Sequence, residues 1–365
     1  MKNIVIDTRA SRFSFLSNSY AIDAQILENI PAQKSEYEFL KHSIKNYDIF
    51  VIALNRYENG KSRPQLSQTQ LNVIFEKISE KIAEFRRKNP DKYIFVLFSE
   101  SFFGSDPLTD VQSMVDKCKS LSNRRRVVIQ ASFLHRFNEK HTPLWLHNYK
   151  PITDVKQIAQ RITRDEKEAP KFLIADENHK DRIANYTLTF CFGRILTIYR
   201  KSTYCRAADK LLIKDRTHAY EFGDFQSHKL LKSPIADLFC EENPLIATRM
   251  CSDMNDPHIS SATKLIIVHA NDHPTDQSHY KNISVPILFI DDKGIAVSRV
   301  VQKRIKFSRK IFHKPIDLRL KTNPNFICRN SYFRCFPFEL SKILSMPPNC
   351  EYQILDAVSY DLNLI

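Results

Sequence analysis

The segment Tyr93–Phe98 (YIFVLF) is apolar at every position. Such a run is typical of a strand covered on both faces, because a half-exposed strand alternates apolar and polar residues. Helical patterns flank it, with apolar residues at the i, i+3, i+4 and i+7 spacing of a single helix face. The stripe before it is Leu71, Ile74, Phe75, Ile78, Ile82 and Phe85, and the one after it is Val111, Met114, Val115, Cys118 and Leu121. This order predicts strands covered by helices.

Further apolar runs predict strands over 3–7, 48–54, 126–133, 185–192, 195–199, 244–250, 264–270, 286–291 and 295–300. Gly193 and Gly294 lie at tight turns between neighbouring runs, which indicates two hairpins. Ser67 with Gln70 three residues later fits a capping box, and Pro90 closes that helix. Interleaved strands and helices with added hairpins favour an α/β class with a layered sandwich.

The 365-residue chain shows no internal repeat and no low-complexity linker, which favours one domain over residues 1–301. Residues 136–180 are polar and irregular and are interpreted as an insertion, with one helix around 155–162. Residues 302–365 are predicted to be a C-terminal extension that packs on the domain or on a partner subunit. No run approaches the roughly 20 apolar residues of a membrane span, and the N-terminus lacks a secretory signal. A cytoplasmic protein is therefore expected, with secretion by a signal-independent route left open.

The net charge of +14 favours an anionic partner such as nucleic acid, an acidic lipid surface or an acidic substrate. The densest basic stretch, 303–319, holds seven Lys or Arg against one Asp, with Phe307 and Phe312 interleaved. That pattern could suit single-stranded nucleic acid, but a solvated basic surface is the favoured interpretation. No helix-turn-helix, zinc-finger or RNA-recognition signature accompanies the charge.

The eight cysteines form no CxxC pair and no regular framework, which argues against a zinc cluster and a disulfide scaffold. Most, including Cys328 and Cys335, are expected to be ordinary packing residues.

Three ionisable residues directly follow predicted strands: Glu100, Lys201 and Cys251. Each alone has an ordinary explanation, as a solvated carboxylate, a surface charge or a buried thiol. Together they fit nucleophilic catalysis. A thiolate attacks, a carboxylate takes and returns its proton, and an ammonium stabilises the oxyanion. Backbone N–H groups after the cysteine, beginning at Ser252, could be further donors if a helix starts there. The set suits acyl transfer from an amide or nitrile through a thioester.

The order of these segments resembles the nitrilase, or carbon–nitrogen hydrolase, superfamily. The matching motifs are VLFSESFFG around Glu100, NYTLTFCFGRILTIYRKS ending after Lys201, YEFGD at 220–224, RMCSDMN around Cys251, and the hairpin VPILFIDDKGIAVSRV. The resemblance covers about residues 1–301. It implies a four-layer α-β-β-α sandwich that dimerises through helical faces and a small-molecule amide or carbamoyl substrate rather than a nitrile. It implies neither a metal nor a cofactor.

By the same resemblance, Asp209, Ser252, His269 and Asn271 are expected to contact the substrate. Asp209 departs from the family pattern, because many members carry a Glu eight residues after the Lys. His269, Asp272 and His273 could suggest a metal site, but no third ligand has convincing spacing, so pocket lining or loop structure is favoured.

Two further interpretations of the function are left open. The chain could be a catalytically silent nitrilase-fold binding or scaffold protein with a basic surface, since its charge is high and its loops diverge. The same three residues could also transfer the acyl group to an amine rather than to water.

Overall fold

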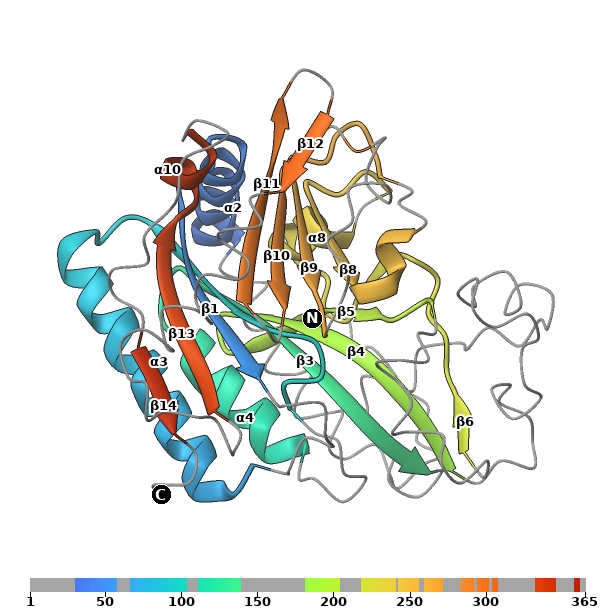
Figure 1. Ribbon diagram of the computed structural model, residues 1–365. Coiled ribbons are helices and arrows are strands. Elements are labelled where there is room, and N and C mark those ends of the chain that lie inside the picture. Colours follow the sequence, from blue (N-terminus) through green and yellow to red (C-terminus); the bar gives the residue numbers. More distant parts are fainter. Residues whose placement is uncertain are drawn as a thin grey trace, which may run out of the picture.

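The computed structural model describes residues 30–57, 66–103, 111–138, 181–203, 218–240, 242–255, 259–271, 283, 285–291, 294–301, 304–307, 332–345 and 358–361 (Figure 1). These residues form a mixed α/β fold built on two β-sheets, as the sequence predicts. The helices are α2 (Ile30–Lys45), α3 (Gln68–Lys88), α4 (Val111–Ser122), α8 (Pro234–Cys240) and α10 (Leu340–Ser345).

The first sheet has the strand order β14-β13-β1-β2-β3-β4-β5-β7, and β6 pairs with β4. Strands β1, β2 and β3 are parallel because α3 and α4 connect them, and the other neighbours along this order are antiparallel. The strands are β1 (Ile49–Tyr57), β2 (Tyr93–Phe98), β3 (Val127–Asn138), β4 (Asp181–Cys191), β5 (Arg194–Arg200), β6 (His218–Tyr220), β7 (Ser227–Lys229), β13 (Tyr332–Glu339) and β14 (Val358–Asp361).

The second sheet has the order β12-β11-β10-β9-β8. Its parallel part consists of β8 (Ile246–Met250), β9 (Leu265–His269) and β10 (Ile287–Asp291), and β11 (Gly294–Val301) and β12 (Arg304–Phe307) add antiparallel neighbours. A turn of 3₁₀-helix, η3 (Cys251–Asn255), follows β8 directly.

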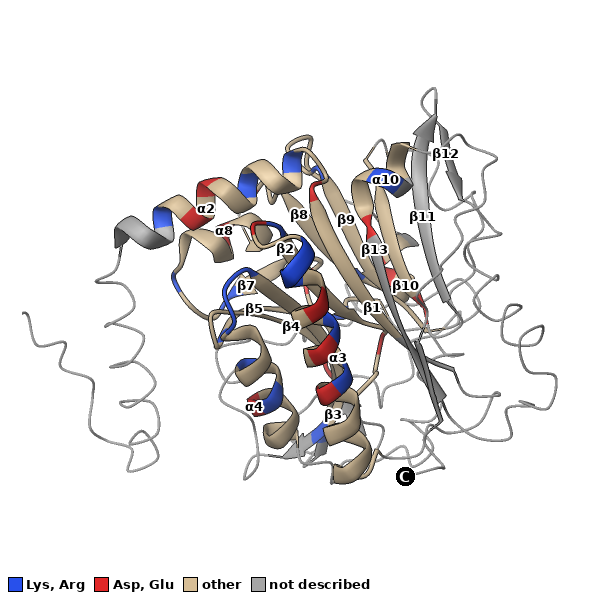
Figure 2. Cartoon of the chain, turned by 90° about the vertical axis from the view of Figure 1, so that its left-hand side faces the viewer, with Lys and Arg blue, Asp and Glu red and all other residues tan. Residues whose placement is uncertain are grey.

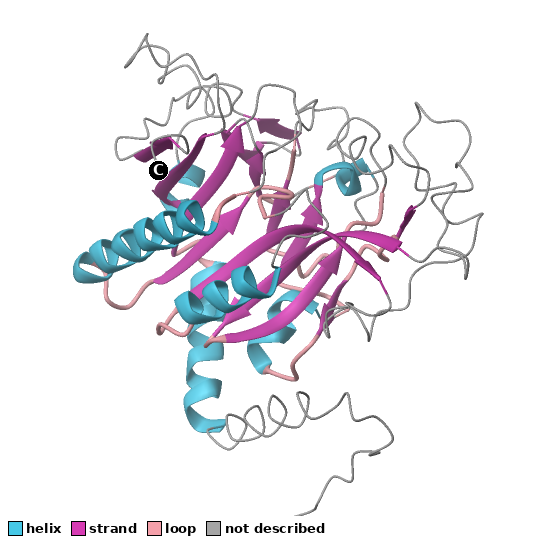
Figure 3. Ribbon diagram, turned by 90° about the horizontal axis from the view of Figure 1, so that it is seen from below, coloured by secondary structure: helices cyan, strands magenta, loops and turns pink. Residues whose placement is uncertain are grey.

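Helices α3 and α4 cover one face of the first sheet, and the second sheet packs against its other face (Figure 1 and Figure 3). Successive side chains of a strand point to opposite faces, so the all-apolar β2 contributes to both cores. Toward the helices lie Ile94, Val96 and Phe98, and between the sheets lie Tyr93, Phe95 and Leu97. The strand is buried at every position, which confirms the prediction for this run.

Helix α3 buries the predicted stripe, and its Ser67–Gln70 capping box is formed by both reciprocal hydrogen bonds, 2.8 and 3.2 Å long. Its outward face carries mixed charge, including the exposed Lys77–Glu80 pair (Figure 2). Helix α2 packs on α8, and both contribute side chains to the core between the sheets. No helix of the described residues is long and apolar enough to cross a membrane.

The hairpin predicted around Gly193 is formed by β4 and β5, with Gly193 at a φ of 71° that suits glycine. Strand β3 continues to Asn138 and pairs with β4 up to Asp181, so the chain leaves and re-enters the sheet at neighbouring positions on either side of 139–180. Strand β13 of the C-terminal region pairs with β1 inside the first sheet. The strand predicted at 3–7 and the helix predicted at 155–162 lie outside the described residues.

Candidate active site

Glu100, Lys201 and Cys251 each follow the C-terminal end of a strand, as predicted. Glu100 is the second residue after β2, Lys201 directly follows β5, and Cys251 directly follows β8. The first two strands belong to the first sheet and β8 to the second, so the three residues approach from both sheets. All three side chains are almost fully buried.

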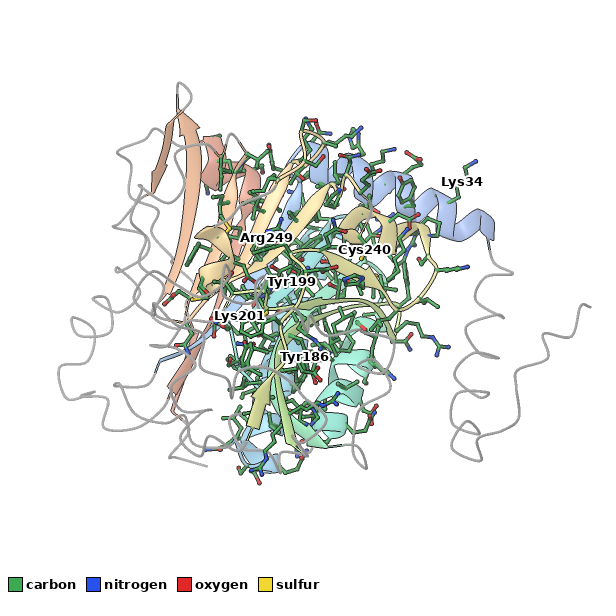
Figure 4. The ribbon with its side chains drawn as sticks, turned by 90° about the vertical axis from the view of Figure 1, so that its right-hand side faces the viewer. Lys34, Tyr186, Tyr199, Lys201, Cys240 and Arg249 are labelled. Atoms are coloured by element: carbon green, nitrogen blue, oxygen red, sulfur yellow. The ribbon has the colours of Figure 1, made fainter. Side chains whose placement is uncertain are left out.

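Glu100 and Lys201 form a buried ion pair. The Lys201 ammonium donates to Glu100 Oε1 over 2.6 Å, and both side chains are 0% exposed. The Asn185 side chain donates to the same oxygen over 2.7 Å, and the Asn185 carbonyl accepts the Lys201 backbone N–H. Figure 4 shows Lys201 in the interior of the molecule. Burial of a charge is costly unless the charge is paired and hydrogen-bonded. The ion pair and the Asn185 hydrogen bond offset that cost for Glu100 and Lys201.

Hydrogen bonds join the Cys251 loop to the segments that carry Glu100 and Lys201. The Cys251 thiol donates to the carbonyl of Asn271 over 3.8 Å, and the neighbouring Ala270 carbonyl accepts the Glu100 backbone N–H over 3.2 Å. The Ser252 hydroxyl donates to the Thr203 carbonyl over 2.9 Å. The structure therefore brings the segments of all three predicted residues together.

Cys251 has a backbone φ of 40°. This left-handed region costs a residue with a Cβ about 1–2 kcal/mol, and it persists only where the surroundings enforce it. Here a buried strand ends abruptly and a 3₁₀ turn begins, which is a geometry that presents a nucleophile at the end of a sheet.

Asp253 is a functional candidate whose role the sequence did not reveal. Its carboxylate accepts the backbone N–H groups of Ser202 (3.0 Å) and Thr203 (2.6 Å) and the hydroxyl of Tyr199 (2.7 Å). Burial raises the pKa of this carboxyl, and the Tyr199 hydrogen bond opposes that shift. Because Asp253 lies two residues after Cys251, it fixes the Cys251 turn to the Lys201 loop. The RMCSDMN motif contains this aspartate, but its partners become visible only in three dimensions.

The YEFGD segment supports the Lys201 loop from the other side. Gly223 donates its backbone N–H to the Lys201 carbonyl over 2.9 Å, and Phe225, directly after the segment, donates its backbone N–H to the Ser202 hydroxyl over 2.7 Å. Glu221 is buried and accepts a hydrogen bond from the guanidinium of Arg200.

His269 lies between the two sheets and is 0% exposed. Its Nδ1 is 2.6 Å from the Phe98 carbonyl, and its Nε2 is 3.1 Å from Oε1 of Gln130. Both ring nitrogens face protein groups, and the predicted substrate contact of His269 stays a prediction. Asn271 is positioned with its carbonyl toward Cys251, whereas Asp209, Asp272 and His273 lie outside the described residues. Within the described part of the chain, no group of three potential metal-ligating side chains was found.

The buried imidazole of His269 makes stability depend on pH. Burial lowers its pKa to about 4, below the unfolded value of about 6.5. The unfolded chain therefore binds the proton more readily, and stability present above pH 6.5 is lost as the pH falls toward 4. We expect this histidine alone to remove about 3 kcal/mol of unfolding free energy between pH 7 and pH 4. Urea unfolding of the wild type and of His269→Gln at pH 7 and pH 4 measures this loss. If the unfolding free energies of both proteins depend on pH in the same way, the prediction is wrong.

A cavity of about 290 Å³ lies along the outer edge of β8, lined by thirteen residues that do not include the catalytic candidates. Part of its polar lining is already engaged. The Thr248 hydroxyl accepts from Gln130, Thr263 donates to the Pro244 carbonyl, and Arg249 donates to the Thr248 carbonyl. We therefore place the candidate site at the buried ion pair rather than in this cavity.

No protein-family model and no curated protein sequence matches this chain. Among solved structures, a crystal structure of a glutamine-dependent NAD(+) synthetase from Cytophaga hutchinsonii matches with a TM-score of 0.35 and 7% sequence identity. The match covers 71% of this chain and 40% of the length of that chain. A likeness of this degree carries no argument about fold or function, so the site is argued from its own geometry.

Proposed function

We propose that this protein hydrolyses a non-peptide carbon–nitrogen bond of an amide or carbamoyl compound through a thioester on Cys251. The observation that carries the proposal is the buried Glu100–Lys201 pair, with 2.6 Å between Nζ and Oε1. The Lys201 loop is hydrogen-bonded to the Cys251 turn directly, and the Glu100 segment is connected to it through Ala270 and Asn271. A buried carboxylate and a buried ammonium, on loops connected by hydrogen bonds to the turn that carries the thiol, supply the base and the oxyanion stabiliser that acyl transfer requires.

The proposed reaction has two stages. In the first, Glu100 accepts the Cys251 proton, the thiolate attacks the carbonyl carbon, and Lys201 stabilises the oxyanion. The carbon–nitrogen bond then breaks as Glu100 returns the proton to the nitrogen, and the amine leaves. In the second stage water attacks the thioester, with Glu100 as base, and releases the acid and the thiol. The net change is amide plus water to carboxylic acid plus amine.

Other parts of the proposal come from the family resemblance. We propose that Asp209 orients the substrate or the attacking water and that the Ser252 backbone N–H donates to the oxyanion. We also propose the four-layer sandwich over residues 1–301, the extension over 302–365, and a homodimer that gel filtration would detect. Transfer of the acyl group to an amine would need only a different second nucleophile.

Selective alkylation of Cys251 tests the proposal. We expect iodoacetamide to label Cys251 at pH 7.5 about tenfold or more faster than Cys191 and Cys240, because the thiolate is the reactive form. Burial raises the pKa of each of those two thiols to about 12, so they serve as references within the same chain. Mass-spectrometric site mapping gives the rate at each cysteine. Glu100→Gln and Lys201→Met are each expected to slow labelling of Cys251 alone.

The control is that Cys191 and Cys240 keep their slow rates in both variants, which shows that the fold persists. If Cys251 reacts no faster than those references in the wild type, the enzymatic proposal is wrong. The catalytically silent scaffold then becomes the better account of the chain. If labelling is selective but unchanged in both variants, the roles of Glu100 and Lys201 are wrong.

A further inference from the structure

Asn185 lies beside the proposed proton carrier. It belongs to β4, and its side chain is 1% exposed. Its Nδ2 donates to Glu100 Oε1 over 2.7 Å, and its main-chain carbonyl accepts the Lys201 N–H over 2.8 Å. Asn185 thus holds both members of the ion pair, one through its side chain and one through its backbone.

The other end of the Asn185 carboxamide is unsatisfied. Its Oδ1 is buried and has no hydrogen-bond partner among the described residues. The same holds for the hydroxyl of Thr187, two residues along the same face of β4, and for that of Ser99, directly before Glu100. Buried polar atoms in native proteins are almost always hydrogen-bonded, so acceptors of this kind indicate a bound donor. Oδ1 and Nδ2 share one planar carboxamide, so Oδ1 lies next to the Glu100 carboxylate.

We infer that Asn185 Oδ1 accepts a hydrogen bond from the nitrogen of the substrate's scissile amide. This inference rests on the proposed function and narrows its substrate to amides with at least one N–H on that nitrogen. A carboxamide oxygen can only accept, so its partner must be a donor. Esters, nitriles and fully substituted amides offer no N–H at this place.

A hydrogen bond from the substrate N–H to Asn185 would also assist protonation of the leaving nitrogen. An N–H directed at Asn185 turns the lone pair of the developing amine toward Glu100, the group that returns the proton. Carbon–nitrogen cleavage requires that proton on the nitrogen, and correct orientation of reacting groups is a large part of rate enhancement. Asn185 is therefore a substrate-binding residue that also positions Glu100.

Two small alkylating probes test the inference. Chloroacetamide carries an amide N–H, and chloroacetonitrile has the same reactive carbon without one. We expect the amide-to-nitrile rate ratio at Cys251 to exceed the ratio at Cys240 by about three- to tenfold, the effect of one hydrogen bond. Asn185→Leu should abolish that preference, because it removes the acceptor. Asn185→Asp should keep it, because it retains an acceptor oxygen, while the proton that two such close carboxyl groups share replaces the lost amide donor to Glu100.

The outcomes distinguish a failure of this inference from a failure of the proposed function. An amide preference that is lost in Asn185→Leu and kept in Asn185→Asp supports the inference. Selective labelling of Cys251 without amide preference, or with a preference that survives in Asn185→Leu, overturns the inference and leaves the proposed function standing. Labelling of Cys251 no faster than Cys240 by either probe overturns both. If the leucine variant does not fold, Asn185→Ala tests the same loss of the acceptor. In the wild type, an amide-to-nitrile rate ratio at Cys251 equal to the ratio at Cys240 overturns the inference without any variant.

Discussion

Replacement of Lys201 by methionine is expected to lower the free energy of unfolding by about 3–5 kcal/mol. The side chains are similar in length, so the main change is the loss of the positive charge that neutralises Glu100. Both groups are 0% exposed, and removal of one partner leaves an uncompensated charge in the interior. Urea unfolding at pH 7.5 measures the loss.

The double variant Glu100→Gln/Lys201→Met is the control. Because it removes both charges, it should recover most of the stability that Lys201→Met loses, and a double-mutant cycle gives the coupling directly. The exposed pair Lys77–Glu80, with side chains 38% and 54% exposed, provides a matched comparison. Lys77→Met should change stability by no more than about 0.5 kcal/mol, since solvent screens that pair. Additive effects at Glu100 and Lys201 would contradict a buried ion pair.

Replacement of Asp253 by alanine is expected to lower the free energy of unfolding by about 3–9 kcal/mol. Three buried donors lose their acceptor at once: the N–H groups of Ser202 and Thr203 and the hydroxyl of Tyr199. Each buried group left without a partner costs about 1–3 kcal/mol. We also expect slower alkylation of Cys251, because the carboxylate that joins its turn to the Lys201 loop is gone. Thermal unfolding and site-mapped alkylation measure the two effects.

Tyr199→Phe in the Asp253→Ala background tests whether the unsatisfied Tyr199 hydroxyl contributes to the loss of stability. It removes one of the three unsatisfied donors, so it should be less damaging there than in the wild type. Asp253→Asn, which keeps one acceptor oxygen, should lie between wild type and alanine in both measurements. An alanine variant with wild-type stability and wild-type labelling would show that the carboxylate does not hold these loops together.

Local patterns made much of the fold predictable. The apolar stripe of α3, its Ser67 cap and the continuous apolar run of β2 depend on neighbours a few residues away, and all were correct. The placement of Glu100, Lys201 and Cys251 after strands followed from the same patterns. Ionisable residues at strand ends are visible in sequence because the apolar run stops there.

The features of the candidate site that the sequence does not predict depend on contacts between distant segments. The partners of Asp253 are about fifty positions away, and Asn185 reaches Glu100 across 85 positions, so neither role has a sequence signature. The expectation that His269 lines a pocket rested on resemblance, whereas its contacts with the Phe98 carbonyl and Gln130 Oε1 depend on the packing of two sheets. The left-handed backbone of Cys251 likewise results from its surroundings, since nothing in the residue type favours it.

The pairing of β13 with β1 has a consequence for biosynthesis. Residues 332–339 close one edge of a strand made from residues 49–57, while β2 closes the other edge much earlier. On a ribosome that adds roughly 5–20 residues per second, β1 waits on the order of tens of seconds for its second neighbour. During that interval the nascent chain exposes an unprotected strand edge, the kind of surface on which chains aggregate. Chaperone protection of this edge during translation would therefore limit aggregation of the nascent chain.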